Sequence, residues 1–121
     1  MARVTIYHNP ACSKSRGALE ILRERGVELD VVEYLKQPPD RAALERMLDL
    51  LPGDPSALVR RDRRFAELGL DAAATASREG VVELLLAHAE LMERPVVIRG
   101  GRAVIARPSE KVLSLLGQEG E

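Results

Sequence analysis

Short strand-like runs and longer stretches with helical spacing alternate along the first third of the chain. The run 4–7 is β-branched and aromatic, which favours a strand. From about Ser13 apolar side chains recur every three or four residues, which predicts a helix that Gly26 ends. Residues 29–35 again resemble a strand. A strand, helix, strand order of this length predicts a βαβ unit with parallel strands, in a sheet buried on both faces.

The middle of the chain has helical spacing and no strand signal. Asp40 is a suitable N-cap for a helix that Pro52-Gly53 ends. A short helix is predicted over 54–59, where it leads into a run of arginines. A further amphipathic helix is expected from about Ser77 and ends before Met92.

The final third predicts an antiparallel hairpin, because the strand-like runs 96–98 and 103–105 flank the pair Gly100-Gly101. A last helix is expected to start at residues 107–110, with Pro in its first turn and with these residues facing the core: Val112, Leu113 and Leu116. This order predicts an α/β, thioredoxin-like fold. Its small mixed β-sheet combines a βαβ unit with a C-terminal β-hairpin and carries a helical insertion. We expect one domain over 1–117 and a polar tail over 118–121.

Composition narrows the function classes. The chain has 121 residues, 45% of them hydrophobic, which is enough for one core. A net charge of -1 argues against nucleic acid and anionic membranes as partners, and no apolar run approaches the roughly 20 residues that span a bilayer. One cysteine excludes an internal disulfide and a cysteine-rich metal site, and no metal site or bound cofactor is expected. Without a signal or transit pattern, the expected location is a reducing, cytoplasmic compartment.

That single cysteine, Cys12, stands between the first predicted strand and the first predicted helix. The free N–H groups of a helix start and the helix dipole favour a thiolate over a thiol. A buried, inert cysteine is the alternative. Ser15, one turn along the helix, can donate to the thiolate but cannot form a disulfide with it, so a resolving thiol must come from another molecule. His8 as a cation would also favour a thiolate, but it can equally be a hydrogen-bonded strand-end side chain.

Three arginines have positions that suggest an oxyanion site, although 15 of the 18 basic residues are arginine and a single one is weak support. Arg94 precedes Pro95, where thioredoxin-like proteins carry a cis-proline beside the catalytic thiol. Arg107 ends the last strand, just before a helix start. Arg60 lies in the inserted segment, where Arg61 is an equally possible ligand. Guanidinium groups are planar forks suited to oxyanions, and the alternative for each is a solvated surface arginine.

Six motifs in register from about residue 3 to 117 resemble the glutaredoxin-coupled arsenate reductase family. They are Ile6-Tyr7-His8-Asn9-Pro10-x-Cys12-x-x-Ser15-Arg16, Tyr34-Leu35-x-x-Pro38-Pro39, Leu58-Val59-Arg60, Glu67-Leu68-Gly69-Leu70, Arg94-Pro95-Val96-Val97 and Arg107-Pro108-Ser109-Glu110. The sequence departs from the best-known members of this family at position 13, which is Ser where they have Gly.

The resemblance implies that Cys12 is the nucleophile and that Arg60, Arg94 and Arg107 bind arsenate, while His8 and Ser15 tune the thiolate. It also implies reduction of arsenate to arsenite through a covalent adduct on Cys12, with glutathione as co-substrate and glutaredoxin as partner. Two alternatives remain open: a glutathione-dependent thiol reductase acting on another substrate, and a non-enzymatic redox-family regulator. Ser15 argues against the regulator, because one cysteine cannot close an intramolecular switch.

Overall fold

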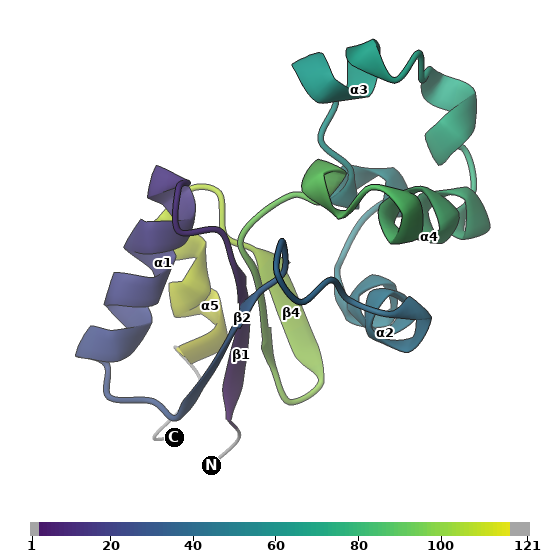
Figure 1. Cartoon of the computed structure of the whole chain (residues 1–121). Helices are drawn as coiled ribbons and strands as arrows, with labels where there is room; N and C mark the ends of the chain where they lie inside the picture. Colours follow the sequence, from purple (N-terminus) through teal and green to yellow (C-terminus); the bar gives the residue numbers. More distant parts are fainter. Residues whose placement is uncertain (1–2, 117–121) are drawn as a thin grey trace.

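A four-stranded sheet in the order β2-β1-β3-β4 forms the centre of the protein (Figure 1). The computed structural model of the chain describes residues 3–116. The strands are β1 (Val4–His8), β2 (Leu29–Glu33), β3 (Val96–Arg99) and β4 (Arg102–Ile105). β1 pairs in parallel with β2, and β3 runs antiparallel to both β1 and β4. This confirms the predicted mixed sheet with a βαβ unit and a hairpin.

The helices begin largely where side chains can cap them. The α-helices are α1 (Ser13–Glu24), α2 (Arg41–Leu50), α3 (Arg63–Glu67), α4 (Arg78–Ala87) and α5 (Leu113–Leu116), and the 3-10 turns are η1 (Pro55–Leu58), η2 (Ala72–Thr75), η3 (Ala89–Leu91) and η4 (Ser109–Val112). Asp40 accepts from the Ala43 N–H and Ser77 accepts from the Gly80 N–H, as expected of N-caps. α3 is not predicted by spacing, and Asp62 caps it.

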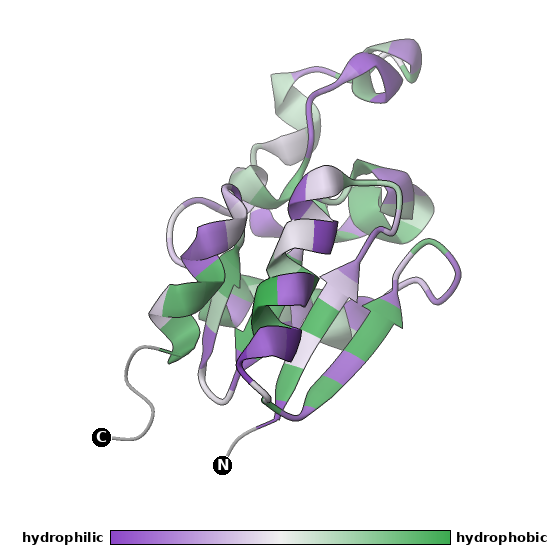
Figure 2. Cartoon of the chain, turned by 90° about the vertical axis from the view of Figure 1, so that its left-hand side faces the viewer, coloured by the Kyte–Doolittle hydropathy of each residue, from purple (hydrophilic) through white to green (hydrophobic). Residues whose placement is uncertain are grey.

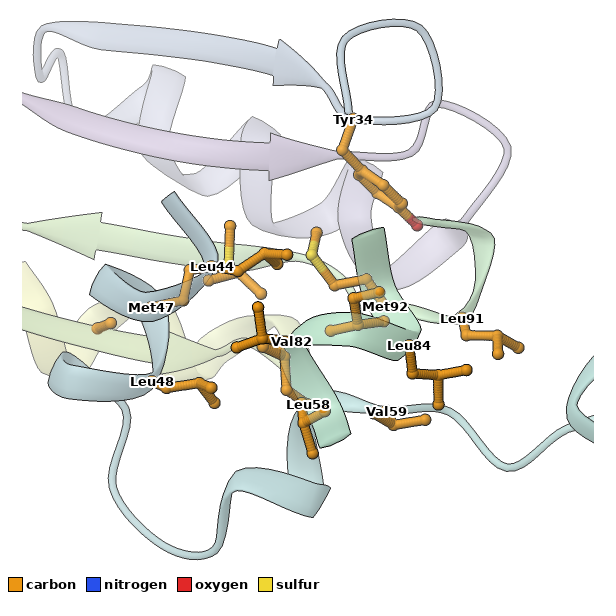
Figure 3. Packing of buried hydrophobic residues seen from close by; sticks show 14 of the residues in the cluster. Tyr34, Leu44, Met47, Leu48, Leu58, Val59, Val82, Leu84, Leu91 and Met92 are labelled. Atoms are coloured by element: carbon orange, nitrogen blue, oxygen red, sulfur yellow. The ribbon is translucent and has the colours of Figure 1, made fainter. Parts of the chain in front are cut away.

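Helices cover both faces of the sheet (Figure 1). α1 and α5 pack on one face around Ile6, Leu22 and Val97. α2 and α4 pack on the other face, where Figure 3 shows the larger of the two hydrophobic clusters. Along β1, buried residues alternate with partly buried ones, so that its side chains enter both clusters, and Figure 2 shows the corresponding change of hydropathy along the strands. The core therefore consists of two layers separated by the sheet.

The strand β2 differs from its prediction in length and in burial. It ends at Glu33, because the N–H groups of Lys36 and Gln37 both bond the Glu33 carbonyl oxygen and fold the chain into a turn. β2 is also an edge strand, and Val31 is 39% exposed there. Burial on both faces holds for β3, whose four residues are all buried, but the expectation is wrong for β2.

The remaining differences concern the ends of elements. The short helix predicted over 54–59 is the 3-10 turn η1, and Val59 instead forms an isolated antiparallel bridge with Met92. The last helix begins as the 3-10 turn η4. In α5, which follows η4, Leu115 is buried, whereas Leu113, which was expected to face the core, is half-buried. The predicted polar tail 118–121 lies outside the described residues. Within 3–116 no helix has the length and apolar character that crossing a membrane requires.

Candidate active site

Cys12 is the N-cap residue of α1, at the end of the sheet where β1 leads into that helix (Figure 1). Its backbone is extended, with φ -99° and ψ 123°, and its side chain makes no capping hydrogen bond. The Cys12 N–H donates to the Asn9 carbonyl oxygen at 3.0 Å, which closes the turn between strand and helix. The sulfur is half-buried and free of any disulfide. It therefore lies beside the unpaired N–H groups of the first helical turn.

The surroundings of Cys12 favour the thiolate. Burial alone would raise the pKa of this thiol, since it penalises the charged form. The backbone N–H of Ser15, the Arg94 side chain and the backbone N–H of Lys14 outweigh it, because donors near the sulfur favour its charged form, and the charge of Arg94 adds to them. The net result is a pKa of Cys12 below the ordinary value. The inert, buried cysteine is thus the less favoured of the two alternatives.

We expect the alkylation of native Cys12 by iodoacetamide to accelerate at a lower pH than that of a free thiol near 8.5, because only the thiolate reacts. Arg94→Ala should move the midpoint of this pH profile upward, since the guanidinium lowers the pKa through both its hydrogen bond and its charge. Arg63→Ala is the control, because Arg63 is exposed on α3. A midpoint equal to that of a free thiol, or one unmoved in Arg94→Ala, would contradict this account.

Ser15 and His8 form a buried pair behind the thiol. The Oγ of Ser15 lies 2.6 Å from Nδ1 of His8 and accepts from the Asn9 N–H at 3.0 Å. The sequence suggested that the Ser15 hydroxyl bonds the thiolate, whereas in the structure this hydroxyl contacts His8 and Asn9, and the backbone N–H of Ser15 is the group that lowers the pKa of Cys12. The hydroxyl proton is available to Cys12 only when Nδ1 of His8 carries a proton and donates to Oγ.

The structure does not favour a cationic His8. Burial lowers the pKa of its imidazole below the ordinary value; the charge of Glu33 opposes this, and Arg23 and Arg16 reinforce it. His8 is therefore neutral at neutral pH. The structure therefore favours the other alternative, a hydrogen-bonded strand-end histidine whose contact toward the thiol runs through Ser15.

Arg94 and Arg107 both reach the thiol from the other end of the chain. The Arg94–Pro95 and Arg107–Pro108 peptide bonds are cis. Nη1 of Arg107 lies 3.8 Å from Sγ of Cys12 and 3.1 Å from the Arg94 carbonyl oxygen, to which it donates. Both arginines are half-buried. The segments before β3 and after β4 thus deliver two guanidinium groups to one sulfur.

Arg60 belongs to the same cluster, but one step removed from the thiol. Its Nε lies 3.7 Å from Oε1 of Glu93, and its Nη1 lies 3.3 Å from Oδ2 of Asp62. The segment is held in place because the Arg60 N–H donates to the Leu91 carbonyl oxygen at 2.7 Å. Arg61 instead donates to Oγ1 of Thr75 at 3.3 Å. Of the two candidates, Arg60 is therefore the one that faces the site.

The structure adds residues that sequence reasoning did not single out as part of the site. Tyr34 is fully buried and directs its hydroxyl toward the segment before β3 (Figure 3). Burial raises the pKa of Tyr34. The charge of Arg94 and a hydrogen bond with Asn9 lower this pKa, and the charges of Cys12 and Glu93 raise it. Tyr34 stands inside a family motif, which is the only signal that marked it. Glu93 had no such signal beyond its place next to Arg94.

A close approach between α1 and η4 fixes the position of the Arg107 segment. Oγ of Ser109 donates to the Lys14 carbonyl oxygen at 2.7 Å. A Cβ on Gly17 would lie 2.6 Å from that Oγ and 3.2 Å from Cβ of Ser109, so only glycine fits without a shift. The first two turns of the helix that carries Cys12 are thus attached to the segment that carries Arg107.

Comparison with known proteins identifies the family. The model of the ArsC family matches residues 7–115, which covers all the candidate residues named above. The chain belongs to the ArsC family. This confirms the resemblance that the six motifs suggested.

Full-length relatives support membership of the ArsC family. YfgD of Escherichia coli (strain K12), an uncharacterised protein, is 42% identical over 117 residues, covering 95% of this chain and 98% of its own. An arsenate reductase of Neisseria meningitidis (strain MC58) is 40% identical over 119 residues, covering 96% and 100%. Among solved structures, an arsenate reductase from Vibrio cholerae superposes with a TM-score of 0.84 at 35% identity, over 93% of this chain and 97% of that one. The thioredoxin-like ArsC fold is thereby confirmed.

Proposed function

We propose that the protein reduces arsenate to arsenite, with Cys12 as nucleophile and with glutathione and glutaredoxin supplying the electrons. The observation that carries the proposal is the sulfur of Cys12, which lies at the start of α1 and 3.8 Å from Nη1 of Arg107, with its pKa lowered partly by Arg94. The names of the Neisseria and Vibrio relatives support arsenate as the substrate.

In the proposed reaction the Cys12 thiolate attacks arsenic and displaces a hydroxide, which leaves as water after protonation. One As–S bond replaces one As–O bond, and arsenic stays at oxidation state +5. Arg94, Arg107 and Arg60 neutralise the negative charge that gathers on the arsenate oxygens, as preorganised cations do in other oxyanion sites. The guanidinium forks suit this task better than ammonium groups, because each presents two parallel N–H donors.

The second half of the reaction needs thiols that the chain does not have. Glutathione adds to the arsenic as a second thiolate and displaces another oxygen as water. The glutaredoxin thiolate then attacks the glutathione sulfur, so that an S–S bond forms and the As–S bond breaks. The electron pair of that bond stays on arsenic, which becomes +3, and water releases arsenite from Cys12. The two electrons come from two thiols, which leave as a mixed disulfide. Such thiols are kept reduced in a cytoplasmic compartment, where we place the reaction.

Oxidation of NADPH through glutathione reductase, glutathione and glutaredoxin tests the proposed function. With all components present, we expect the rate to depend on added arsenate and on this protein. Omission of glutaredoxin should remove most of the rate. A rate that depends on the protein but not on arsenate would favour the reductase of another substrate. No protein-dependent rate with any oxyanion or disulfide would favour the non-enzymatic regulator.

A further inference from the structure

A carboxylate occupies the middle of the arginine cluster. Oε1 of Glu93 lies 3.7 Å from Nε of Arg60 and 3.8 Å from Nε of Arg107. Both separations are longer than a hydrogen bond to oxygen. Glu93 thus stands between two of the arginines to which the proposed function assigns the oxyanion, and it pairs only loosely with either. A negative group in an anion site calls for an explanation, because it lowers the attraction for any fully ionised ligand.

Two buried polar atoms at this site have no hydrogen-bond partner within the described part of the chain. Oε1 of Glu93 is a buried acceptor that receives no hydrogen bond, and Nε of Arg94, on the next residue, is a buried donor that makes none. Buried polar groups are nearly always paired, so each such exception points to a role or to a missing partner. Both atoms are closed to solvent, so a ligand reaches them only when the surrounding side chains move aside, and to satisfy both it must offer an acceptor and a donor. An oxyanion that still carries a hydroxyl group offers both.

The groups around Glu93 make it a good acceptor. Burial raises the pKa of its carboxyl, Arg107 and the Arg94 N–H lower it, and Asp62 raises it, with an elevated pKa as the net result. Arg60 also faces the carboxylate, through Nε. A more basic carboxylate accepts a stronger hydrogen bond from a hydroxyl. Fully ionised oxygens of a ligand would instead meet it with charge repulsion and no proton between them.

We infer that Glu93 is a specificity-determining residue that selects oxyanions bearing a hydroxyl group, by accepting a hydrogen bond from that hydroxyl while the arginines bind the ionised oxygens. The inference rests on the proposed function, because both concern the same site. Arsenate and phosphate each keep at least one hydroxyl at neutral pH, whereas sulfate has none. The site should therefore accept arsenate and phosphate and reject sulfate, although sulfate has a similar shape.

The test measures how well each anion protects Cys12 from iodoacetamide, at one pH and at an ionic strength held constant with chloride. For the wild type we expect half-protection by sulfate to need at least ten times more anion than half-protection by phosphate or arsenate. In Glu93→Gln the amide can donate to an ionised oxygen, so the sulfate-to-phosphate ratio should fall at least tenfold. Glu90→Gln is the matched control, since Glu90 is a nearby carboxylate that pairs with Arg64 at 3.0 Å and lies outside the cluster. Its ratio should equal that of the wild type.

The wild-type comparison needs no variant, so it can overturn the inference even if Glu93→Gln does not fold. Equal protection by sulfate and phosphate in the wild type overturns the inference, as does an unchanged ratio in folded Glu93→Gln or an equal fall in Glu90→Gln. Arsenate-dependent turnover, measured in parallel, separates the two proposals. Turnover without selectivity refutes the role of Glu93 and leaves the proposed function standing. Failure of all three anions to protect Cys12, together with no turnover, refutes both.

Discussion

Replacement of Cys12 by serine is expected to abolish arsenate-dependent turnover while the fold persists. A serine hydroxyl stays protonated at neutral pH and is a far weaker nucleophile than a thiolate, so the first As–S bond cannot form. Serine is also a preferred N-cap residue, and Cys12 makes no side-chain capping bond of its own. The variant should therefore be at least as stable as the wild type. The coupled NADPH assay measures turnover, and thermal unfolding measures stability.

Serine at position 12 also separates chemistry from binding. Because the arginines remain, the variant should still bind phosphate, which can be followed by calorimetry. Loss of turnover together with intact phosphate binding would place the defect in the nucleophile. Turnover retained above the background without protein would be incompatible with a mechanism through Cys12.

Arg94→Ala and Arg107→Ala are each expected to lower kcat/KM for arsenate. The loss should correspond to about 2–4 kcal/mol of transition-state stabilisation, which is the scale seen when one oxyanion donor is removed. Both guanidiniums lie at the sulfur, where negative charge develops. Lysine should restore only part of the loss, because an ammonium lacks the planar fork. Arg60→Ala should cost less, since the contacts of Arg60 are with Glu93 and Asp62 and not with Cys12.

Arg63→Ala is the control for the arginine series. Arg63 is exposed at the start of α3 and is one of four consecutive charged neighbours of Arg60. Its removal changes the net charge by the same amount, yet kcat/KM should stay within about 0.5 kcal/mol of the wild type. Equal losses at Arg63, Arg94 and Arg107 would indicate a general electrostatic field instead of a site.

Local signals were sufficient to predict most of the fold. Asp40 and Ser77 each accept a backbone hydrogen bond at a helix start, and Gly100 takes a φ of +57° in the hairpin turn. Caps, glycine turns and periodicity act over a few residues, so they can be identified in the sequence. The features that were missed depend on distant partners. The ring of Tyr34 is buried among side chains from several elements, and Val59 pairs with Met92 across the insertion.

The candidate site divides in the same way. Cys12 was identifiable because a strand-to-helix turn is a local feature, and the two Arg-Pro pairs mark the ends of strands. The choice of Arg60 over Arg61 was not, because it depends on which side chain faces Glu93 and which reaches Thr75. The lowered pKa of His8 was also beyond sequence reasoning, since it follows from burial. Side-chain direction and solvent access are tertiary properties.

The contact between Arg107 and Cys12 joins residues 95 positions apart, and this distance has a consequence for how the protein matures. Contacts with such a large sequence separation form late, after the loop between them has closed. During synthesis, Cys12 leaves the ribosome long before Arg94 and Arg107 do. A nascent chain can therefore present Cys12 only with the N–H groups of Ser15 and Lys14 beside it, and the guanidinium of Arg94 is added when the C-terminal segments dock. The rate at which Cys12 reaches its full reactivity toward a thiol reagent would thus time the last step of folding.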